Sequence, residues 1–369
     1  MKKIVAVLTV MLLLAVALGA CSSGQEAQEP SGQASQSAEQ SAEPQESQTA
    51  STETGDKIVI GLIQQDLQHP FHLGEVDGAK VCAAKYGFEL VVTSGDGDVN
   101  KQVEAFDNLL EQCDIISINT LDVTAFENSF AKAAEKGVKV VVQHSWSDQT
   151  LGTIGFDEYN MSYEVGQYAI NILKAQGGEL SDKKVVLLTG NEGQGLNEYR
   201  IGGFAKAMEE NSVEILAAEP TNWDGTVAVT KMENYLTTYD HIDLLYGLSD
   251  GVTYPAAQVI INAGRDDEIA ICSIDGSADA IQAIIDGTMD CTYLLASQYT
   301  GYYKVLIPYL CMTGKYDFES QGDYILPGFI VTKDNAAAML ALAQDMESDP
   351  TSINYDKSLE ELVNEYLAK

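Results

Sequence analysis

The chain has 369 residues, of which 45% are hydrophobic, 21% charged and 8% aromatic, a composition typical of globular proteins. At roughly 100–200 residues per domain, this length predicts two folded domains. The 55 aspartates and glutamates outnumber the 21 lysines and arginines, so the formal net charge is −34. A nucleic-acid partner and a surface that adheres to anionic lipid are both excluded, because each needs a basic patch.

The start of the chain has the pattern of an export signal. Two lysines precede an apolar run over 4–18, which is shorter than the roughly 20 residues of a transmembrane helix. The segment then closes in the letters LGAC, with Cys21 last, and this resembles the lipobox of bacterial lipoproteins. The resemblance implies a signal peptide over 1–20 and a palmitate-bearing lipid anchor on Cys21, at the extracytoplasmic face of the cell membrane. An ordinary signal peptide with a chance cysteine is the alternative.

A disordered tether is predicted over 21–55, directly after the anchor. Residues 22–55 contain six glutamates, no lysine or arginine, no aromatic residue and no branched aliphatic residue. Such a segment cannot bury enough apolar surface to offset the conformational entropy lost on ordering. We therefore expect it to hold a folded part at a distance from the membrane.

Short β-rich runs alternate with longer helical patterns from residue 57 onward. The predicted strands are 57–63, 88–92, 115–118, 138–142, 184–188, 213–217, 242–246 and 269–274. The predicted helices are 70–86, 99–112, 123–136, 163–175, 197–210, 226–237 and 254–263. This alternation is typical of parallel sheets covered by helices on both faces. We therefore predict an α/β protein with two doubly wound parallel-sheet lobes.

Polar or aromatic motifs follow several predicted strands, at the carboxyl ends where open parallel sheets bind ligands. In chain order they are Gln68-His69-Pro70-Phe71, the loop ending in His144-Ser145, Thr153–Asp157, the loop from Gly190 to Arg200 with Gly203-Phe204, Ser249-Asp250 and Ser273–Ser277. Across nearly all of 57–332, their order and spacing resemble the type I periplasmic binding proteins of sugar ABC transporters, the ribose-binding-like family. The resemblance implies a three-strand hinge that joins two lobes around a ligand cleft.

The same resemblance implies where each lobe begins and ends. The first lobe is expected to comprise 56–156 plus about 296–325, and the second 157–295 plus about 326–369. Carried over position by position, the family's ligand contacts fall on His69, Phe71, His72, His144, Ser145, Glu198, Trp223, Ser249, Asp275 and Leu295.

Three departures from the family pattern leave the identity of the ligand open. His144-Ser145 replaces the family's usual Asp-Arg pair, Glu198 replaces an arginine, and Leu295 replaces a glutamine. Phe71 and Trp223 can bury the apolar faces of a sugar ring, and Asp275 can accept hydrogen bonds from its hydroxyls. With only two arginines in the whole chain, a neutral polyhydroxylated ligand is favoured over an acid. A nucleoside, a cationic amine or a signalling molecule stays open as the alternative.

Enzymatic and metal-dependent interpretations find less support. Residues 247–251 read GxSxG between a strand and a helix, as in a hydrolase nucleophile elbow, but every histidine precedes Ser249, the reverse of that fold's order. The three histidines 69, 72 and 144 could ligate a metal or bond ligand hydroxyls, and no fourth ligand is in view. We expect no catalytic residue, no cofactor and no resident metal. We also expect these histidines to protonate between pH 7.5 and 5.5 and to weaken binding.

The favoured interpretation is a monomeric, lipid-anchored solute-binding protein that delivers a sugar or polyol to the membrane subunits of an ABC permease. A sensory lipoprotein that presents its ligand-bound form to a membrane receptor is the alternative. The five cysteines after Cys21 are irregularly spaced and predict no disulfide framework.

The substitution Cys21→Ser is expected to abolish lipidation while the folded part stays intact and leaves the membrane fraction, because the tether separates the two. Metabolic labelling with a palmitate analogue, followed by membrane fractionation, measures both effects against the wild type. Equal labelling of the two proteins would contradict the lipobox interpretation.

Overall fold

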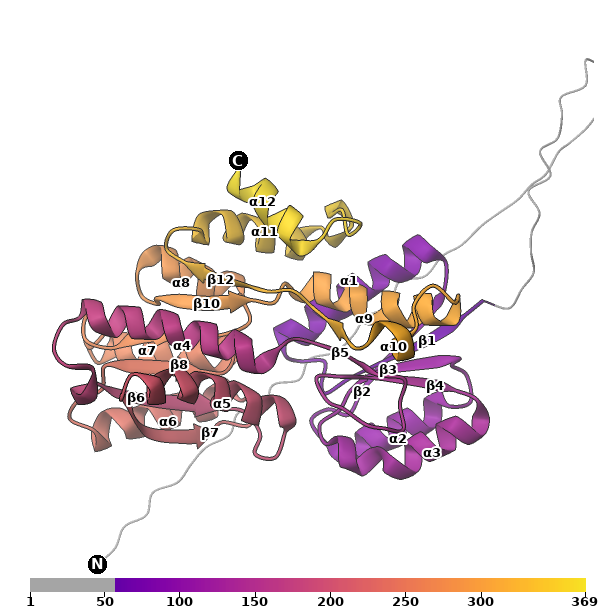
Figure 1. The fold of residues 1–369 in the computed structure, drawn as a ribbon, viewed down its shortest axis with the longest axis horizontal. Coiled ribbons are helices and arrows are strands. Elements are labelled where there is room, and N and C mark those ends of the chain that lie inside the picture. The colour runs from indigo at the N-terminus through magenta and orange to yellow at the C-terminus, as the bar shows by residue number, and fades with distance from the viewer. Residues whose placement is uncertain (1–56) are drawn as a thin grey trace, which may run out of the picture. The chain divides into compact units, whose positions relative to one another are not determined.

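The computed structural model describes residues 57–369, so the predicted signal peptide, Cys21 and the tether lie outside the described residues. Within this part of the chain, two six-stranded sheets form the cores of two lobes (Figure 1). The first sheet has the spatial order β11 (Tyr324–Ile325), β5 (Thr153–Gly155), β4 (Lys139–Gln143), β3 (Ile115–Asn119), β1 (Val59–Gln64) and β2 (Glu89–Ser94). All of its strand pairs are parallel, as the alternating pattern predicts.

Helices cover both faces of the first sheet. They are α1 (Pro70–Tyr86), α2 (Val99–Leu109), η1 (Val123–Phe126), α3 (Glu127–Lys136) and α9 (Ser297–Met312). The helices α1 and α9 pack against each other on one face, although more than 200 residues separate them in sequence. On the other face, the rings of Phe106, Phe126 and Phe130 contact one another and close a core beneath α2 and α3.

The second sheet repeats this architecture with one antiparallel edge. Its spatial order is β12 (Phe329–Thr332), β10 (Cys291–Leu294), β9 (Ala270–Cys272), β8 (Leu244–Gly247), β6 (Lys184–Thr189) and β7 (Glu214–Pro220). Only β12 runs antiparallel to its neighbour, β10, within the described sheet. The covering helices are α4 (Glu158–Ala175), η2 (Leu180–Asp182), α5 (Gly195–Glu210), α6 (Gly225–Thr238), α7 (Asp250–Asn262), α8 (Ala278–Asp286) and α11 (Ala336–Ser348). Among these, α4 packs on α5, α6 on α7, and α8 on α11.

Three segments of chain connect the two sheets. They lie between β5 and α4, between β10 and α9, and between β11 and β12. The remaining elements are α10 (Phe318–Gln321), η3 (Pro350–Ser352) and α12 (Leu359–Leu367). The end of the chain contacts both lobes, since α12 packs on α11 whereas the ring of Tyr355 stacks on that of Tyr302 in α9, with centroids 4.3 Å apart. The hinge therefore has three strands, as the family resemblance implies.

Local capping explains where the structure differs from the predicted elements. The helix α4 begins at Glu158 instead of residue 163, because the Asp157 side chain accepts a hydrogen bond from the Asn160 amide at 3.1 Å. The predicted helix 123–136 divides into η1 and α3, and Asp122 caps the first of these. The strand β5 was not predicted, because three residues are too few for a periodic pattern.

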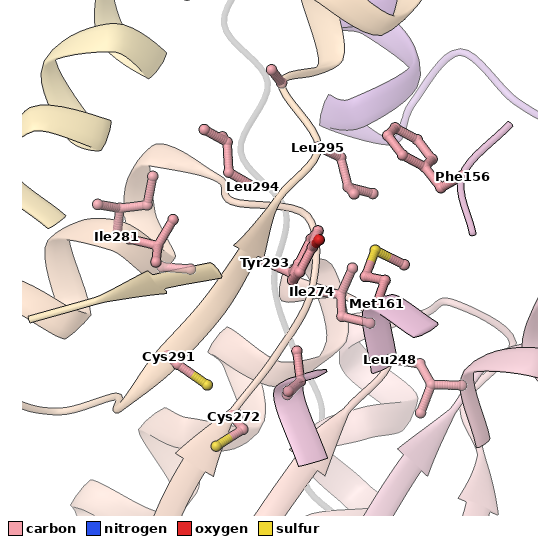
Figure 2. Close-up of a cluster of buried hydrophobic side chains, with 14 of the residues drawn as sticks. Phe156, Met161, Leu248, Cys272, Ile274, Ile281, Cys291, Tyr293, Leu294 and Leu295 are labelled. Carbon is pink, nitrogen blue, oxygen red and sulfur yellow. The ribbon is translucent and has the colours of Figure 1, made fainter. Parts of the chain in front are cut away.

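The core of the second lobe contains two neighbouring cysteines, which Figure 2 shows on adjacent strands. Cys272 of β9 and Cys291 of β10 lie in register, and both are fully buried. Contact with Cys291 and burial raise the pKa of the Cys272 thiol. All five cysteines among the described residues are free. Within residues 57–369, no helix is both long enough and apolar enough to span a membrane.

Candidate functional site

A cavity lies between the two lobes, at the carboxyl ends of strands from both sheets. It contains about 560 Å³ of empty space, part of it open to solvent. The residues that line it are Gln65, Asp66, His69, Phe71, His72, His144, Gln194, Leu196, Arg200, Trp223, Ser249, Asp275 and Leu295. Both lobes contribute, so the shape of the cavity depends on how far the hinge is closed.

Two of the carried-over contact residues do not line this cavity. Ser145 lines a neighbouring groove, where its hydroxyl oxygen lies 3.1 Å from that of Thr120. Glu198 is exposed on α5 and does not line the cavity. At 3.6 residues per turn, Asn197 and Arg200 share the buried face of this helix, so position 198 points about 130° away from the centre of that face. The other carried-over residues do line the cavity, and their role in binding stays a prediction.

One hydrogen bond orients Trp223, and one glycine leaves the space that its ring occupies. Its indole N–H donates to the Gln194 side-chain oxygen at 2.8 Å, and its backbone has a φ of 60°. The ring lies directly over Gly190, where an added Cβ would be 1.9 Å from the indole. The amide nitrogen of Gln194 is buried without a partner, which costs free energy unless a ligand oxygen accepts its hydrogen. This pair therefore combines an apolar ring face with a buried amide donor that has no partner.

Asp275 follows β9 and joins several groups at the base of the cavity. Its carboxylate accepts from the Ser249 hydroxyl at 2.5 Å and from the Asp250 amide at 3.2 Å. Burial raises its pKa to about 6, and the nearby Arg200 guanidinium opposes that rise. Its φ of 121° is unusual for a residue with a side chain, and such strain is often concentrated at binding sites. Backbone hydrogen bonds to Tyr293 and Leu295 hold it in this conformation.

The charged side chains of the cavity are already paired. Arg200 donates to Glu158 at 2.7 Å and to the Leu248 carbonyl at 2.6 Å, and it lies 3.8 Å from Asp275. Asp66 accepts from two backbone amides and lies 3.3 Å from His72. Burial opposes ionisation of Asp66, but these hydrogen bonds lower its pKa overall. The arginine and the carboxylates that line the cavity therefore already have hydrogen-bond partners within the protein, which favours a neutral ligand.

A chain of buried charged groups runs from the first lobe to the second beside the cavity. Glu75 of α1 is paired with Lys304 of α9, and both side chains are fully buried. Lys304 also lies 2.9 Å from Nε2 of His144, whose Nδ1 lies 3.0 Å from Glu158. Glu158 in turn accepts from Arg200 of α5, which completes a connection across the hinge. An ammonium group can only donate, so Nε2 of His144 accepts and Nδ1 carries the proton donated to Glu158.

The environment of the histidines corrects the expectation that all three protonate between pH 7.5 and 5.5. Burial, followed by repulsion from His72, lowers the pKa of His69 to about 4. Burial and the charge of Lys304 lower the pKa of His144. The His69 ring therefore stays neutral at pH 5.5. Both ring nitrogens of His144 have partners within the protein, so neither is left for a metal or a ligand. Within residues 57–369, no three histidine, cysteine or carboxylate side chains cluster as a metal site.

Ser249 has none of the activating contacts of a hydrolase nucleophile. Its hydroxyl donates to Asp275 and caps the start of α7 by accepting from the Gly251 amide. The ring of His69 lies close to the start of α7. A Cβ atom added to Gly251 would be only 2.7 Å from Nε2 of His69. However, Nδ1 of His69 accepts a hydrogen bond from the Phe71 amide, so the proton of the neutral ring is on Nε2. That nitrogen cannot accept the serine proton, which argues against the elbow.

Several cavity residues were not predicted as contacts. Gln65 and Asp66 follow β1 directly, Gln194 ends the loop after β6, and Leu196 lies in the first turn of α5. The rule that ligands bind beyond the carboxyl ends of strands would have found these four. Arg200 carries no comparable signal, because only the folded helix shows which of its faces is buried.

A family model described as the periplasmic binding protein domain matches residues 60–315. The chain belongs to this family. It is 27% identical over 258 residues to the ribose import binding protein RbsB of Salmonella typhimurium, covering 67% of this chain and 82% of that protein. It is 24% identical over 271 residues to the xylitol-binding protein of Mycolicibacterium smegmatis, covering 70% and 73%. A solved ABC transporter solute binding protein from Mycobacterium smegmatis, with bound glycerol, is 25% identical with a TM-score of 0.71, covering 76% of this chain and 96% of that one.

In this periplasmic binding protein, Trp223→Ala is expected to weaken ligand binding about 10- to 100-fold, since loss of a stacked aromatic ring costs roughly 1–3 kcal/mol. Gly190→Ala should weaken binding to a similar degree, because its methyl group displaces the indole. Titration calorimetry measures the affinity of both variants for a ligand that stabilises the wild type. Gly202→Ala is the control, since its Cβ would only contact the Tyr159 ring at 3.5 Å. Unchanged affinity in both variants would place the ligand elsewhere.

Lys304→Met is expected to destabilise the fold by about 3–5 kcal/mol, because it leaves the carboxylate of Glu75 buried without its counter-ion. Urea unfolding monitored by circular dichroism measures the loss. The double variant Lys304→Met/Glu75→Gln should recover part of it. Lys206→Met, which removes an exposed pair with Glu209, should unfold as the wild type does. If Lys304→Met unfolded like this control, the buried charges would not support the structure.

Proposed function

We propose that this chain is the solute-binding protein of an ABC importer, which captures a neutral sugar or polyol between its lobes. It acts outside the cytoplasmic membrane as a monomer, catalyses no reaction, and presents its closed form to the membrane subunits of the permease. The observation that carries the proposal is a cavity between two lobes with aromatic rings, free hydrogen-bonding groups and only paired charges. Its membership of the periplasmic binding protein family supports this function.

The chemistry of the lining residues supports a polyhydroxylated ligand. Phe71 from the first lobe and Trp223 from the second supply ring faces that can cover the C–H surfaces of a sugar. Gln194 offers a donor without a partner, and Ser249 with Asp275 offers hydroxyl and carboxylate oxygens. The relatives named for ribose and xylitol bind compounds of this class, which supports the same class here.

We propose further that a lipid on Cys21 anchors the protein to the extracytoplasmic face of the membrane. The motif that ends in Cys21 and the acidic segment after it support this. An anchored binding protein stays close to its permease without needing a basic surface, which suits a net charge of −34.

A thermal-shift screen of the protein without its signal peptide tests the ligand class. We expect pentoses, hexoses or polyols to raise Tm, since a ligand at 100 times its Kd stabilises the fold by about 2.7 kcal/mol. Nucleosides, polyamines and dicarboxylic acids are included as separate arms, and the Trp223→Ala variant is the control for specificity. Stabilisation by an amine or an acid alone, with no response to any sugar or polyol, would overturn the proposal.

A further inference from the structure

A second groove opens beside the cavity and extends it toward solvent. It contains about 1480 Å³ of empty space, against about 560 Å³ in the cavity. His144, Gln194 and Leu196 line both, so the two spaces share a wall. A ligand group that leaves the cavity past Gln194 would therefore enter this groove. We call it the outer groove, and its main side chains are Asp122, Trp146, Tyr159, Tyr199 and Ile325.

Exposed apolar side chains are concentrated in the outer groove. Eight large hydrophobic residues are exposed among the described residues, and four of them line this one groove. They are Trp146, Tyr199, Ile325 and Tyr159, with 68%, 60%, 57% and 39% of their surface exposed. Trp146 and Ile325 come from the first lobe, and both tyrosines come from helices of the second. Aromatic rings left in water on two sides of one groove indicate a surface that is covered when the protein acts.

Polar groups line the outer groove together with these rings, and they indicate the chemistry of the ligand that would cover the rings. The carboxylates of Asp122, Asp157 and Asp323 line the groove together with the hydroxyls of Thr124 and Thr153. No lysine or arginine is among the lining residues, so a phosphate or carboxylate would meet only negative charge. Ring faces alternating with oxygen acceptors suit a sugar ring, which has apolar faces and hydroxyl groups at its edge.

We propose that the outer groove is a second subsite, which holds the outer ring of a disaccharide or of an aromatic glycoside whose first ring occupies the cavity. The ligand of this protein is then a glycoside, not a free monosaccharide. This inference rests on the proposed function, since it needs a sugar in the cavity. It adds that Trp146 and Tyr199 contribute to affinity only when the ligand has a second ring.

Calorimetric titrations of matched ligands test the subsite. Pentoses and hexoses are each paired with their phenyl glycoside and with disaccharides that carry the same sugar at the non-reducing end, in both anomeric linkages. In the wild type, at least one two-ring ligand should bind about tenfold or more tightly than its free sugar. In Trp146→Ala/Tyr199→Ala, this advantage should disappear while affinity for the free sugar is unchanged. Leu367→Ala removes an exposed apolar side chain outside the groove and should change neither affinity.

Tryptophan fluorescence gives an independent measurement, because the chain has only two tryptophans, Trp146 in the groove and Trp223 in the cavity. A two-ring ligand should change the wild-type emission more than its free sugar does, and Trp146→Phe should abolish that difference. If no two-ring ligand binds more tightly than its free sugar, or if the double variant weakens both equally, the subsite is overturned and the proposed function stands. If only a polyol binds the wild type, the subsite is likewise overturned and the proposed function stands. If no sugar, glycoside or polyol binds, both proposals are overturned.

Discussion

The buried chain of charges from Glu75 through Lys304, His144 and Glu158 to Arg200 constrains how the two lobes meet. Ionised groups lose several kcal/mol of hydration when they are buried, so each must find a partner with good geometry. Every partner here comes from a different helix or loop. The packing of α1 on α9, the conformation of the loop after β4 and the start of α4 must therefore be correct together.

The same pairing decides which ligands the cavity suits. Arg200 would suit a carboxylate if it were free, but its charge is already paired with Glu158 and it also donates to the Leu248 carbonyl. His144 uses both ring nitrogens within the chain of charges, although it follows a strand at the position where the family contacts its ligands. The cavity is left with neutral donors, paired carboxylates and aromatic rings. A polyhydroxylated ligand satisfies such groups without burying an unpaired charge.

Among the departures from the family pattern, His144 and Ser145 line the outer groove. Glu198 is exposed on α5, next to the groove residue Tyr199. Leu295 makes the cavity wall more apolar where a glutamine is usual in the family. The fold therefore keeps the lobes and hinge of a periplasmic binding protein, while a second groove with exposed aromatic rings adjoins its cavity.

Most of the architecture could be predicted from the sequence, because alternating strands and helices are local patterns with a fixed period. The sequence runs of β1, β6 and α1 were assigned in this way, and the family resemblance implied Trp223, Ser249 and Asp275, which line the cavity. The strand β5 and the early start of α4 were missed, because a three-residue strand has no period and a cap is a single side chain. The lowered pKa values of His69 and His144 were also missed, since pKa values depend on burial and on neighbouring charges.

The amino-acid sequence alone thus determined the fold class, the family resemblance and the edge of each sheet where a ligand should be sought. The tertiary structure decided which side chains are free to bind. Lys304 is 229 residues from Glu75 in the sequence, and Arg200 is 42 residues from Glu158. No periodic pattern encodes such pairs, because they arise only when distant helices pack and exclude the water that would otherwise solvate the charges.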